Sequence, residues 1–366
     1  MPKGKTPKRL FVAATRQDQG KTTISLGLLA AFDELEPPVG FIKPVGQRYV
    51  EIRGVRVDKD VALIDTVLKT DAALTDMSPI TVGRNFTREY ISKPNSQELA
   101  DKILAAFARV EAGKNVVLIE GTGHAGVGSC FDMSNARVAE LLEAKVVIIT
   151  EGGIGAPIDE TMLNVSLFRD HKVPILGVIL NKVHPEKLDA VTAFAEEGLA
   201  RKGIALLGVV PHEETLANPS MQQILSEVGG DILNGGEFLG NEIETVIVGA
   251  MTAHRALDYF YLNSLLITPG DRDDLILAAM SSYGDEKANH VAGMILTGGI
   301  RPHENIVRLI RRTQIPCILV RGNSYAIAAA VHNLKIKIQP TDTRKIAVAC
   351  RLVKQHVKVQ QILNSL

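Results

Sequence analysis

Residues 9–35 read RLFVAATRQDQGKTTISLGLLAAFDEL. The run RLFVAAT is apolar and rich in small and branched side chains, which is typical of a strand buried on both faces. The window TISLGLLAAFDEL has helical periodicity and places on one side the apolar residues Ile24, Leu26, Leu28, Leu29 and Phe32. The polar, glycine-containing segment between them predicts a loop that joins a strand to a helix.

The same alternation of strand-like and helical windows continues along the chain. Further apolar runs are VGFIKPV (39–45), NVVLIEG (115–121), KVVIITEG (145–152), PILGVILNKV (174–183) and ALLGVVP (205–211). Strands of this kind, separated by amphipathic helices, indicate an α/β fold in which a mostly parallel sheet is covered by helices on both faces.

The pattern loosens between residues 212 and 240, where we place a domain boundary near Gln222. Alternating elements then resume with TVIVGAMT (245–252), SLLITPG (264–270), VAGMILTGG (291–299) and PCILVRG (316–322). We therefore expect a first domain over residues 1–222 and a smaller α/β domain over 223–340. Residues 341–366 carry spaced apolar side chains and are expected to form a helical tail that packs on the body or on a neighbouring subunit.

The loop after the first strand has the features of a phosphate-binding P-loop. Its GKT sequence sits between a buried strand and a helix, which is the context that this motif requires. Thr15 stands where the usual pattern has its first glycine. Backbone N–H groups would cradle the phosphates of ATP, Lys21 would reach the β and γ oxygens, and the Thr22 hydroxyl would hold Mg²⁺. The expected nucleotide-binding residues are Thr15, Arg16, Gln17, Asp18, Gln19, Gly20, Lys21, Thr22 and Thr23.

Phosphoryl transfer also needs carboxylates that hold Mg²⁺. Glu120 ends a buried strand and Asp60 follows the second strand, so both are candidates. Glu120 could instead cap a turn, and Asp58 competes with Asp60 or caps the next helix. Lys43 ends a strand at the edge where open α/β sheets bind ligands, although a solvated lysine is the alternative.

These motifs together resemble dethiobiotin synthetase and its relatives, including cobyrinic acid a,c-diamide synthases. The resemblance rests on the P-loop, Phe41-Ile42-Lys43-Pro44-Val45, Asp58-Lys59-Asp60, Glu120-Gly121-Thr122-Gly123 and Leu180-Asn181-Lys182. It covers about the first 220 residues and implies the P-loop NTPase type of sheet.

The resemblance implies roles for individual residues. Asp60 and Glu120 match the magnesium carboxylates, Lys43 matches a lysine that contacts substrate and phosphate, and Asn181 matches an asparagine that contacts adenine, with a turn asparagine as the alternative. Gly121 opens a glycine-rich segment suited to close approach of a phosphate or substrate. The sequence after Val45 departs from the synthetase pattern, which argues against dethiobiotin synthesis.

Two further loop residues have open interpretations. His124 could donate to a phosphate or a bound acid, or be solvated. Arg16 occupies the position at which partition-type ATPases carry a lysine that reaches across a dimer, which would place nucleotide at a subunit interface.

The second domain carries Thr268-Pro269-Gly270-Asp271-Arg272 and Leu296-Thr297-Gly298-Gly299. These residues resemble the DRTGG domain that accompanies a synthetase-like module in the N-terminal region of long phosphotransacetylases. The chain ends where their acyltransferase domain would begin, so phosphate acetyltransferase activity is not expected. Helix capping and tight turns explain the motif as well as a ligand site or subunit contact does, and His254, Arg255 and Arg301 are candidates to receive an anionic metabolite.

Composition narrows the remaining classes. Lys+Arg 41 balances Asp+Glu 41, which argues against nucleic-acid and membrane partners. The three cysteines fit reduced thiols in the cytoplasm, and the basic N-terminus shows no targeting segment. We expect a homo-oligomer that binds nucleotide and a small carboxylate or anionic metabolite. Whether the protein is an enzyme stays open. One alternative is a regulatory nucleotide-binding protein, and the other is an ATP-dependent ligase that forms an acyl phosphate. The expected catalytic residues are Lys21 and Lys43.

Overall fold

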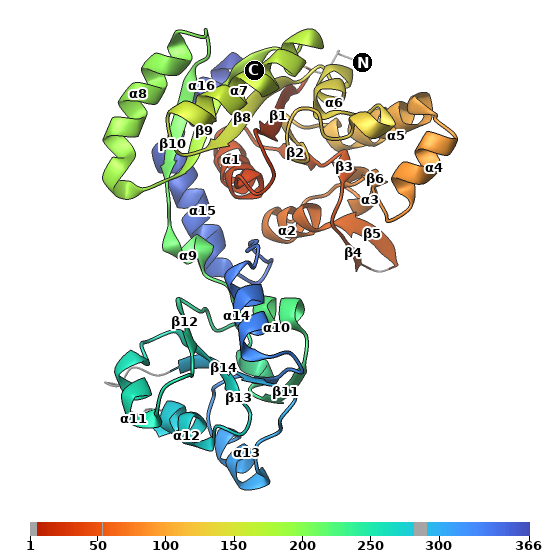
Figure 1. Cartoon of the computed structure of the whole chain (residues 1–366). Coiled ribbons are helices and arrows are strands. Elements are labelled where there is room, and N and C mark those ends of the chain that lie inside the picture. Colours follow the sequence, from red (N-terminus) through yellow and green to blue (C-terminus); the bar gives the residue numbers. More distant parts are fainter. Residues whose placement is uncertain (1–5, 53, 282–290) are drawn as a thin grey trace. The chain divides into compact units, whose positions relative to one another are not determined.

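The computed structural model describes residues 6–52, 54–281 and 291–366. It divides into two compact units, of which the first comprises Met1–Glu213 with Ile338–Leu366 and the second Glu214–Lys337 (Figure 1). The first five residues of the basic N-terminus lie outside the described residues. The domain boundaries expected at 222 and 340 stay predictions.

The first unit is built on a parallel six-stranded sheet of order β10-β9-β8-β1-β7-β2. Its strands coincide with the apolar runs of the sequence. They are β1 (Lys8–Ala14), β2 (Val39–Ile42), β7 (Val116–Glu120), β8 (Lys145–Glu151), β9 (Ile175–Val183) and β10 (Leu206–Pro211). Every residue of β7 is buried, because a central parallel strand is covered on both faces.

Helices cover both faces of this sheet (Figure 1). The connection from β1 to β2 runs in one direction across the sheet, and the later connections run in the opposite direction. Because crossovers between parallel strands are right-handed, α1 lies on one face of the sheet and α5 to α8 lie on the other. These helices are α1 (Lys21–Leu35), α5 (Ser96–Glu111), α6 (Asn135–Leu141), α7 (Gly155–Asp170) and α8 (Leu188–Ala200).

The face that carries α1 is completed from the far end of the chain. The helices α15 (Thr343–His356) and α16 (Val359–Ser365) pack against α1 and β10. Lys358 N–H donates to Leu207 O at 2.7 Å, and Val357 bridges to Gly208. The C-terminal helices therefore cover apolar surface that the crossover helices leave open.

An excursion between β2 and β7 brings further residues to the carboxyl edge of the sheet. The two-residue strands β3 and β6 pair with each other, as do β4 and β5 of a hairpin. The elements are β3 (Val45–Gly46), β4 (Tyr49–Ile52), β5 (Val55–Asp58), α2 (Lys59–Leu68), α3 (Leu74–Met77), β6 (Ile80–Thr81) and α4 (Phe86–Ser92).

The second unit has a five-stranded sheet of order β11-β15-β14-β13-β12, in which only β11 is antiparallel to its neighbour. One apolar core lies under α10 and α14, and the other under α11, α12 and α13. The strands are β11 (Asp231–Asn234), β12 (Thr245–Val248), β13 (Ser264–Pro269), β14 (Val291–Thr297) and β15 (Cys317–Leu319). The helices are α9 (Glu214–Ala217), α10 (Met221–Val228), α11 (Ala253–Ala256), α12 (Asp273–Ser281), α13 (Glu304–Ile310) and α14 (Ser324–His332).

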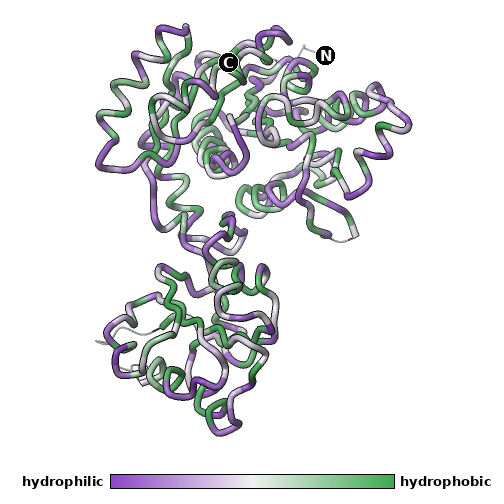
Figure 2. Tube along the Cα trace, viewed as in Figure 1, coloured by the Kyte–Doolittle hydropathy of each residue, from purple (hydrophilic) through white to green (hydrophobic). Residues whose placement is uncertain are grey.

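Short 3-10 turns complete the described structure at Ser129–Phe131, Pro185–Lys187, Gly236–Phe238 and Leu257–Tyr259. Hydrophobic residues run along the central strands of each unit, as Figure 2 shows. The predicted fold class, a helix-covered parallel sheet followed by a smaller α/β unit, is confirmed. None of the helices in the described ranges is long and apolar enough to cross a lipid bilayer.

The contact between α1 and α15 depends on a glycine. A Cβ added to Gly27 would lie 2.4 Å from Val353 Cγ2 and 3.0 Å from the backbone oxygen of Ala349. We expect Gly27→Ala to lower the stability of the first unit by about 1–3 kcal/mol, because overpacking outweighs the gain in helix propensity. Thermal unfolding followed by circular dichroism measures this change.

Gly155→Ala is the matched control, since a Cβ there meets nothing within 4 Å at the start of α7. An unchanged midpoint in Gly27→Ala would contradict this account of the packing.

Candidate functional site

The P-loop leaves the end of β1 and is anchored to the neighbouring strand β8. Thr15 N–H donates to Ile149 O at 2.9 Å, and the Thr15 hydroxyl donates to Thr150 Oγ1 at 3.1 Å. Thr15 is buried. A threonine at the position of the first P-loop glycine is therefore part of the anchor, which the sequence motif did not indicate.

The tip of the loop is held by the end of β9. Asn181 Nδ2 donates to Gln19 O at 3.0 Å, and Lys182 Nζ donates to Asp18 O at 2.8 Å. Gly20 has a φ of 83° and would place an added Cβ 2.2 Å from Asn181 Nδ2. Only glycine suits this position, because both its backbone conformation and its space exclude a side chain. In this structure Asn181 thus shapes the loop.

Helix α7 holds the other side of the loop. Arg16 forms an ion pair with Glu160 at 2.6 Å, although its side chain is largely exposed. Asn164 accepts from Ala125 N–H at 2.7 Å and donates to Thr15 O at 3.5 Å. Sequence reasoning missed Asn164, because a lone asparagine in a helix carries no local signal that it links two loops.

Of the remaining loop residues, Gln17 and Asp18 are exposed and Gln19 is buried. Gln19 Oε1 is a buried atom without a hydrogen-bond partner among the described residues. Thr23 is half-buried in the first turn of α1. The first N–H groups of a helix have no intrahelical partner, so this end of α1 presents donors and the positive end of the helix dipole.

The candidate metal-binding side chains converge beside the start of α1. The Thr22 hydroxyl donates to Glu120 Oε1 at 3.3 Å, which joins α1 to the end of β7. Asp60 lies buried in the first turn of α2, and its N–H donates to Asp58 Oδ1 at 2.9 Å. Asp58 is therefore the helix cap that the sequence allowed.

Lys43 binds all three of these carboxylates. Its Nζ lies 3.1 Å from Asp58 Oδ1 and 3.3 Å from Glu120 Oε1, and it donates a hydrogen bond to Asp60 Oδ2. Its side chain is only 6% exposed. The alternative of a solvated strand-end lysine is therefore wrong, because the buried carboxylates require a compensating charge.

The charges of this cluster shift its pKa values. Burial by itself would lower the pKa of Lys43, but the charges of Asp60, Glu120 and Asp58 raise that pKa above its usual range. Burial raises the pKa of Glu120, against the opposing charge of Lys43. Lys43 therefore stays protonated, and it is the main charge that opposes the effect of burial on the pKa of Glu120.

The glycine-rich segment after β7 is held by Asn135, another residue that sequence reasoning missed. Its Nδ2 donates to Thr122 O at 2.8 Å, and its Oδ1 accepts from Thr122 N–H at 3.1 Å. A Cβ on Gly121 would lie 2.8 Å from that same Oδ1. His124 is exposed, and its Nδ1 accepts from Gly126 N–H at 3.2 Å. The glycine-rich segment is therefore tightly packed at Gly121, whereas the side chain of His124 is exposed.

Within the described ranges, no group of three or more His, Cys, Asp or Glu side chains is arranged to hold a metal ion by itself. Thr22, Asp60 and Glu120 supply oxygen donors only, and Glu120 Oε2 is buried without a hydrogen-bond partner in the described structure. Mg²⁺ in nucleotide sites commonly takes one or two carboxylates together with phosphate oxygens and water. The donor set is thus suited to Mg²⁺ that arrives with a nucleotide.

In the second unit, the TGG and DR residues tie loops together. Arg272 Nη2 donates to Met251 O at 2.8 Å, and Gly298 N–H donates to Gly322 O at 2.8 Å. A Cβ on Gly270 would lie 1.7 Å from Ile300 O. These contacts favour the structural interpretation of the motif.

The three basic candidates of this unit remain on its surface. His254 and Arg255 are exposed in α11. Arg301 pairs with Glu304 at 3.7 Å. No contact that joins them is observed in the described part of the chain.

We expect Arg272→Ala to loosen the loop after β12, because its guanidinium also donates to Gly249 O at 3.4 Å. Peptides that cover residues 245–252 should then exchange amide hydrogens several-fold faster, measured by mass spectrometry. Asp274→Ala removes the ion pair of Arg272 and leaves its contacts with the backbone oxygens, so it serves as the control. Equal exchange rates in Arg272→Ala and the unmodified protein would contradict the proposed role of Arg272 in holding this loop.

We expect Lys43→Met to destabilise the first unit by about 3–5 kcal/mol at pH 8, because it leaves buried carboxylates without their counter-charge. A carboxyl whose folded pKa is raised binds more protons in the folded than in the unfolded state. Stability therefore falls as pH rises, and the loss should be smaller at pH 5 than at pH 8. Thermal unfolding at the two pH values measures the difference.

Lys102→Met controls for loss of a lysine, since Lys102 forms an exposed pair with Glu98 on α5. Adding Glu120→Gln to Lys43→Met should restore part of the stability at pH 8. A loss that is the same at both pH values would contradict the proposed charge compensation.

Comparisons with known proteins agree with this architecture. A family model described as an AAA domain, AAA_26, matches residues 8–220, and one described as a DRTGG domain matches residues 223–334. The phosphate acetyltransferase of Nitratidesulfovibrio vulgaris is 28% identical over 364 residues, which cover 96% of this chain and 51% of that protein. That of Pseudomonas putida is 26% identical over 366 residues, covering 95% and 50%. The chain thus spans about half the length of the curated relatives it matches.

Among solved structures, the chain is similar to the MinC:MinD cell division protein complex of Aquifex aeolicus, with 14% identity, a TM-score of 0.37, and coverage of 57% of this chain and 84% of that one. The expected resemblance to the N-terminal region of phosphotransacetylases is confirmed. Since its model covers more than half of the residues, the chain belongs to the AAA_26 family of AAA domains, followed here by a DRTGG domain.

Proposed function

We propose that the first unit binds ATP with Mg²⁺ at the P-loop and that the chain is a regulatory nucleotide-binding protein. One observation carries this proposal above the others. The Thr22 hydroxyl meets Glu120 at 3.3 Å directly after Lys21, while the second oxygen of Glu120 is buried without a partner in the described structure. Hydroxyl, carboxylate and lysine are the groups that a P-loop offers to Mg²⁺ and to the nucleotide phosphates.

Each residue of the site has a proposed role. The first turn of α1 directs its N–H groups and helix dipole toward the phosphates, and Lys21 neutralises their charge. Thr22, Glu120 and Asp60 would hold Mg²⁺, which offsets the negative charge of the phosphates when bound. Lys43 forms ion pairs with both carboxylates, and its proposed role is to contact a transferred phosphoryl group.

The two sides of the loop have different proposed roles. Asn181 fixes the tip of the loop at Gln19. It also matches the asparagine with which dethiobiotin synthetase and its relatives contact adenine. Arg16 is held by Glu160 of its own chain, so a contact across a dimer would require that pair to open. We further propose that the protein is a cytoplasmic homo-oligomer that responds to a small anionic metabolite.

The second candidate function is an ATP-dependent ligase. In that reaction an oxygen of a small carboxylate forms a bond to the γ-phosphorus, the bond from phosphorus to the β-bridging oxygen breaks, and ADP leaves. An amine then displaces phosphate from the acyl phosphate. The tightly packed segment 121–128 beside Glu120 is the observation that favours it, since such a segment could position the acid.

The proposal is tested by calorimetric titration of ATP with and without Mg²⁺. We expect Lys21→Ala to weaken binding by about 10-fold to 100-fold, because it removes a charge-assisted hydrogen bond to the phosphates. Glu120→Gln should remove most of the Mg²⁺ dependence. Lys102→Ala is the matched control and should bind like the unmodified protein.

Equal ATP affinity in the unmodified protein and Lys21→Ala, with both folded by circular dichroism, would overturn the proposal. ATP turnover in the presence of small carboxylic acids separates the two functions. Stimulation by one acid supports the ligase, whereas tight binding with no stimulated turnover supports the regulatory protein.

A further inference from the structure

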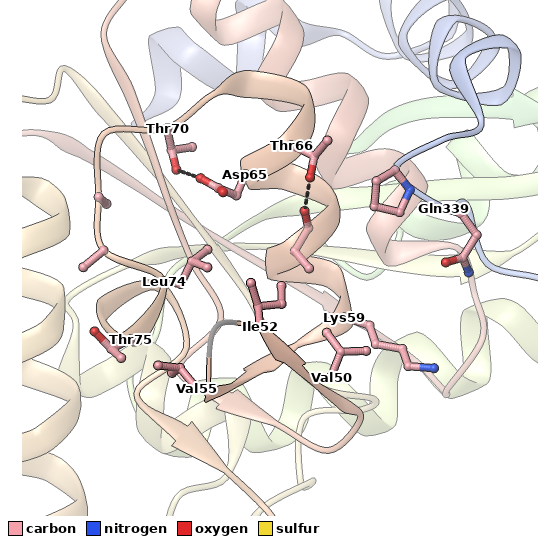
Figure 3. A pocket seen from close by; sticks show the side chains of 14 residues that line it. Val50, Ile52, Val55, Lys59, Asp65, Thr66, Thr70, Leu74, Thr75 and Gln339 are labelled. Carbon is pink, nitrogen blue, oxygen red and sulfur yellow. Dashed lines mark hydrogen bonds between the residues drawn. The ribbon is translucent and has the colours of Figure 1, made fainter.

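A cavity of about 760 Å³ opens beside α2 in the first unit (Figure 3). None of the P-loop residues lines it. Its volume lies within the range of small-molecule binding sites. The residues that line it come from the β4–β5 hairpin, from α2 and the segment after it, and from Gln339 and Pro340, which precede α15.

One wall of this cavity is apolar and incompletely covered. Val50, Ile52 and Val55 of the hairpin line it together with Leu74. Ile52 is paired with Val55 and Val50 with the buried Val57, so one face of the hairpin is continuously apolar. The lining members of that face are only half-buried. Covering them would remove apolar surface from water and favour a ligand with an apolar body.

The polar groups of the cavity specify the charge of such a ligand. Asp65 already accepts a hydrogen bond from the Thr70 hydroxyl at 2.5 Å, and the Thr66 hydroxyl donates to Ala62 O at 2.8 Å. Among the described residues of the lining, Lys59 is the one cationic residue, and no ion pair with it occurs in the described ranges. Figure 3 places its ammonium group on the same side of the cavity as Gln339.

We propose that this cavity binds a small monoanion with an apolar body, such as a medium-chain carboxylate. The carboxylate pairs with Lys59, and the hydrocarbon covers the hairpin face. A dianion or a phosphate ester fits less well with the described part of the lining, because that part supplies one cation and also contains the Asp65 carboxylate.

The position of the cavity makes it a regulatory site. Helix α2, which forms one wall, carries Asp58 at its cap and Asp60 in its first turn, and both bind Lys43. Gln339, which also lines the cavity, belongs to the segment that directly follows the second unit in the chain. If the first unit binds ATP as proposed, the bound anion and the bound ATP therefore influence each other's affinity through α2.

The test uses the absence of tryptophan from the chain. Thr75→Trp places a single tryptophan on the exposed rim of the cavity, and octanoate is titrated without nucleotide. We expect a saturable change in emission. 1-Octanol, which has the same chain without the charge, should bind about fivefold more weakly, the scale of one partly exposed ion pair.

Three variants in the Thr75→Trp background locate the ligand. Lys59→Met should reduce octanoate affinity to that of 1-octanol, while the matched control Lys102→Met leaves it unchanged. Ala62→Phe fills the cavity from α2. This variant should keep its melting temperature and lose the emission changes with both octanoate and 1-octanol. If Ala62→Phe fails to fold, Ala62→Leu replaces it. The octanoate affinities of Lys59→Met and Lys102→Met then decide whether the ligand binds at Lys59.

No saturable signal, or octanoate binding that neither Lys59→Met nor cavity filling alters, overturns the site. Repeating the titration with ATP and Mg²⁺ should shift octanoate affinity about fivefold, and Lys21→Ala should remove that shift. Unchanged octanoate affinity in a protein that binds ATP overturns the coupling alone. Because the first titration contains no nucleotide, its failure is distinct from failure of the proposed function.

Discussion

The first unit depends on one lysine buried among carboxylates. Lys43 joins the end of β2 to the cap of α2 through Asp58 and Asp60, and to the end of β7 through Glu120. A buried charge is stable only when it is paired, so these three segments must meet at one point of the sheet edge. That point lies beside the first turn of α1, where Thr22 contacts Glu120. The charge balance of the core and the geometry of the candidate site thus have the same origin.

The P-loop itself is shaped by its neighbours more than by its own sequence. Strand β8 holds Thr15, the end of β9 holds Gln19 through Asn181, and α7 holds the base of the loop through Asn164. The loop departs from the usual glycine pattern at its first position and is anchored there by a threonine hydroxyl. A preorganised loop loses little conformational entropy when a ligand binds, which favours a phosphate site at this position.

Helix α2 begins at this edge of the sheet, and α15 packs on α1 and β10. Gly27 permits α15 to lie close to α1, and Gln339, shortly before α15, lines the cavity beside α2. Helix α2 thus contributes both to the carboxylate cluster around Lys43, through Asp60, and to the cavity that Gln339 also lines. In that second unit, Arg272 and the Gly298 turn are engaged in backbone contacts, so the motif contributes to loop packing.

The amino-acid sequence by itself determined the α/β class, the positions of the strands and the P-loop, because periodicity and the strand-loop-helix order are local properties. It also identified Glu120, Asp60 and Lys43 as residues near one edge. Only the tertiary structure decided that Lys43 binds all three carboxylates, that Asn135 and Asn164 hold the loops, and that α15 covers the face beside α1. These contacts join residues far apart in the chain, and their energies depend on burial and distance, which no local pattern encodes.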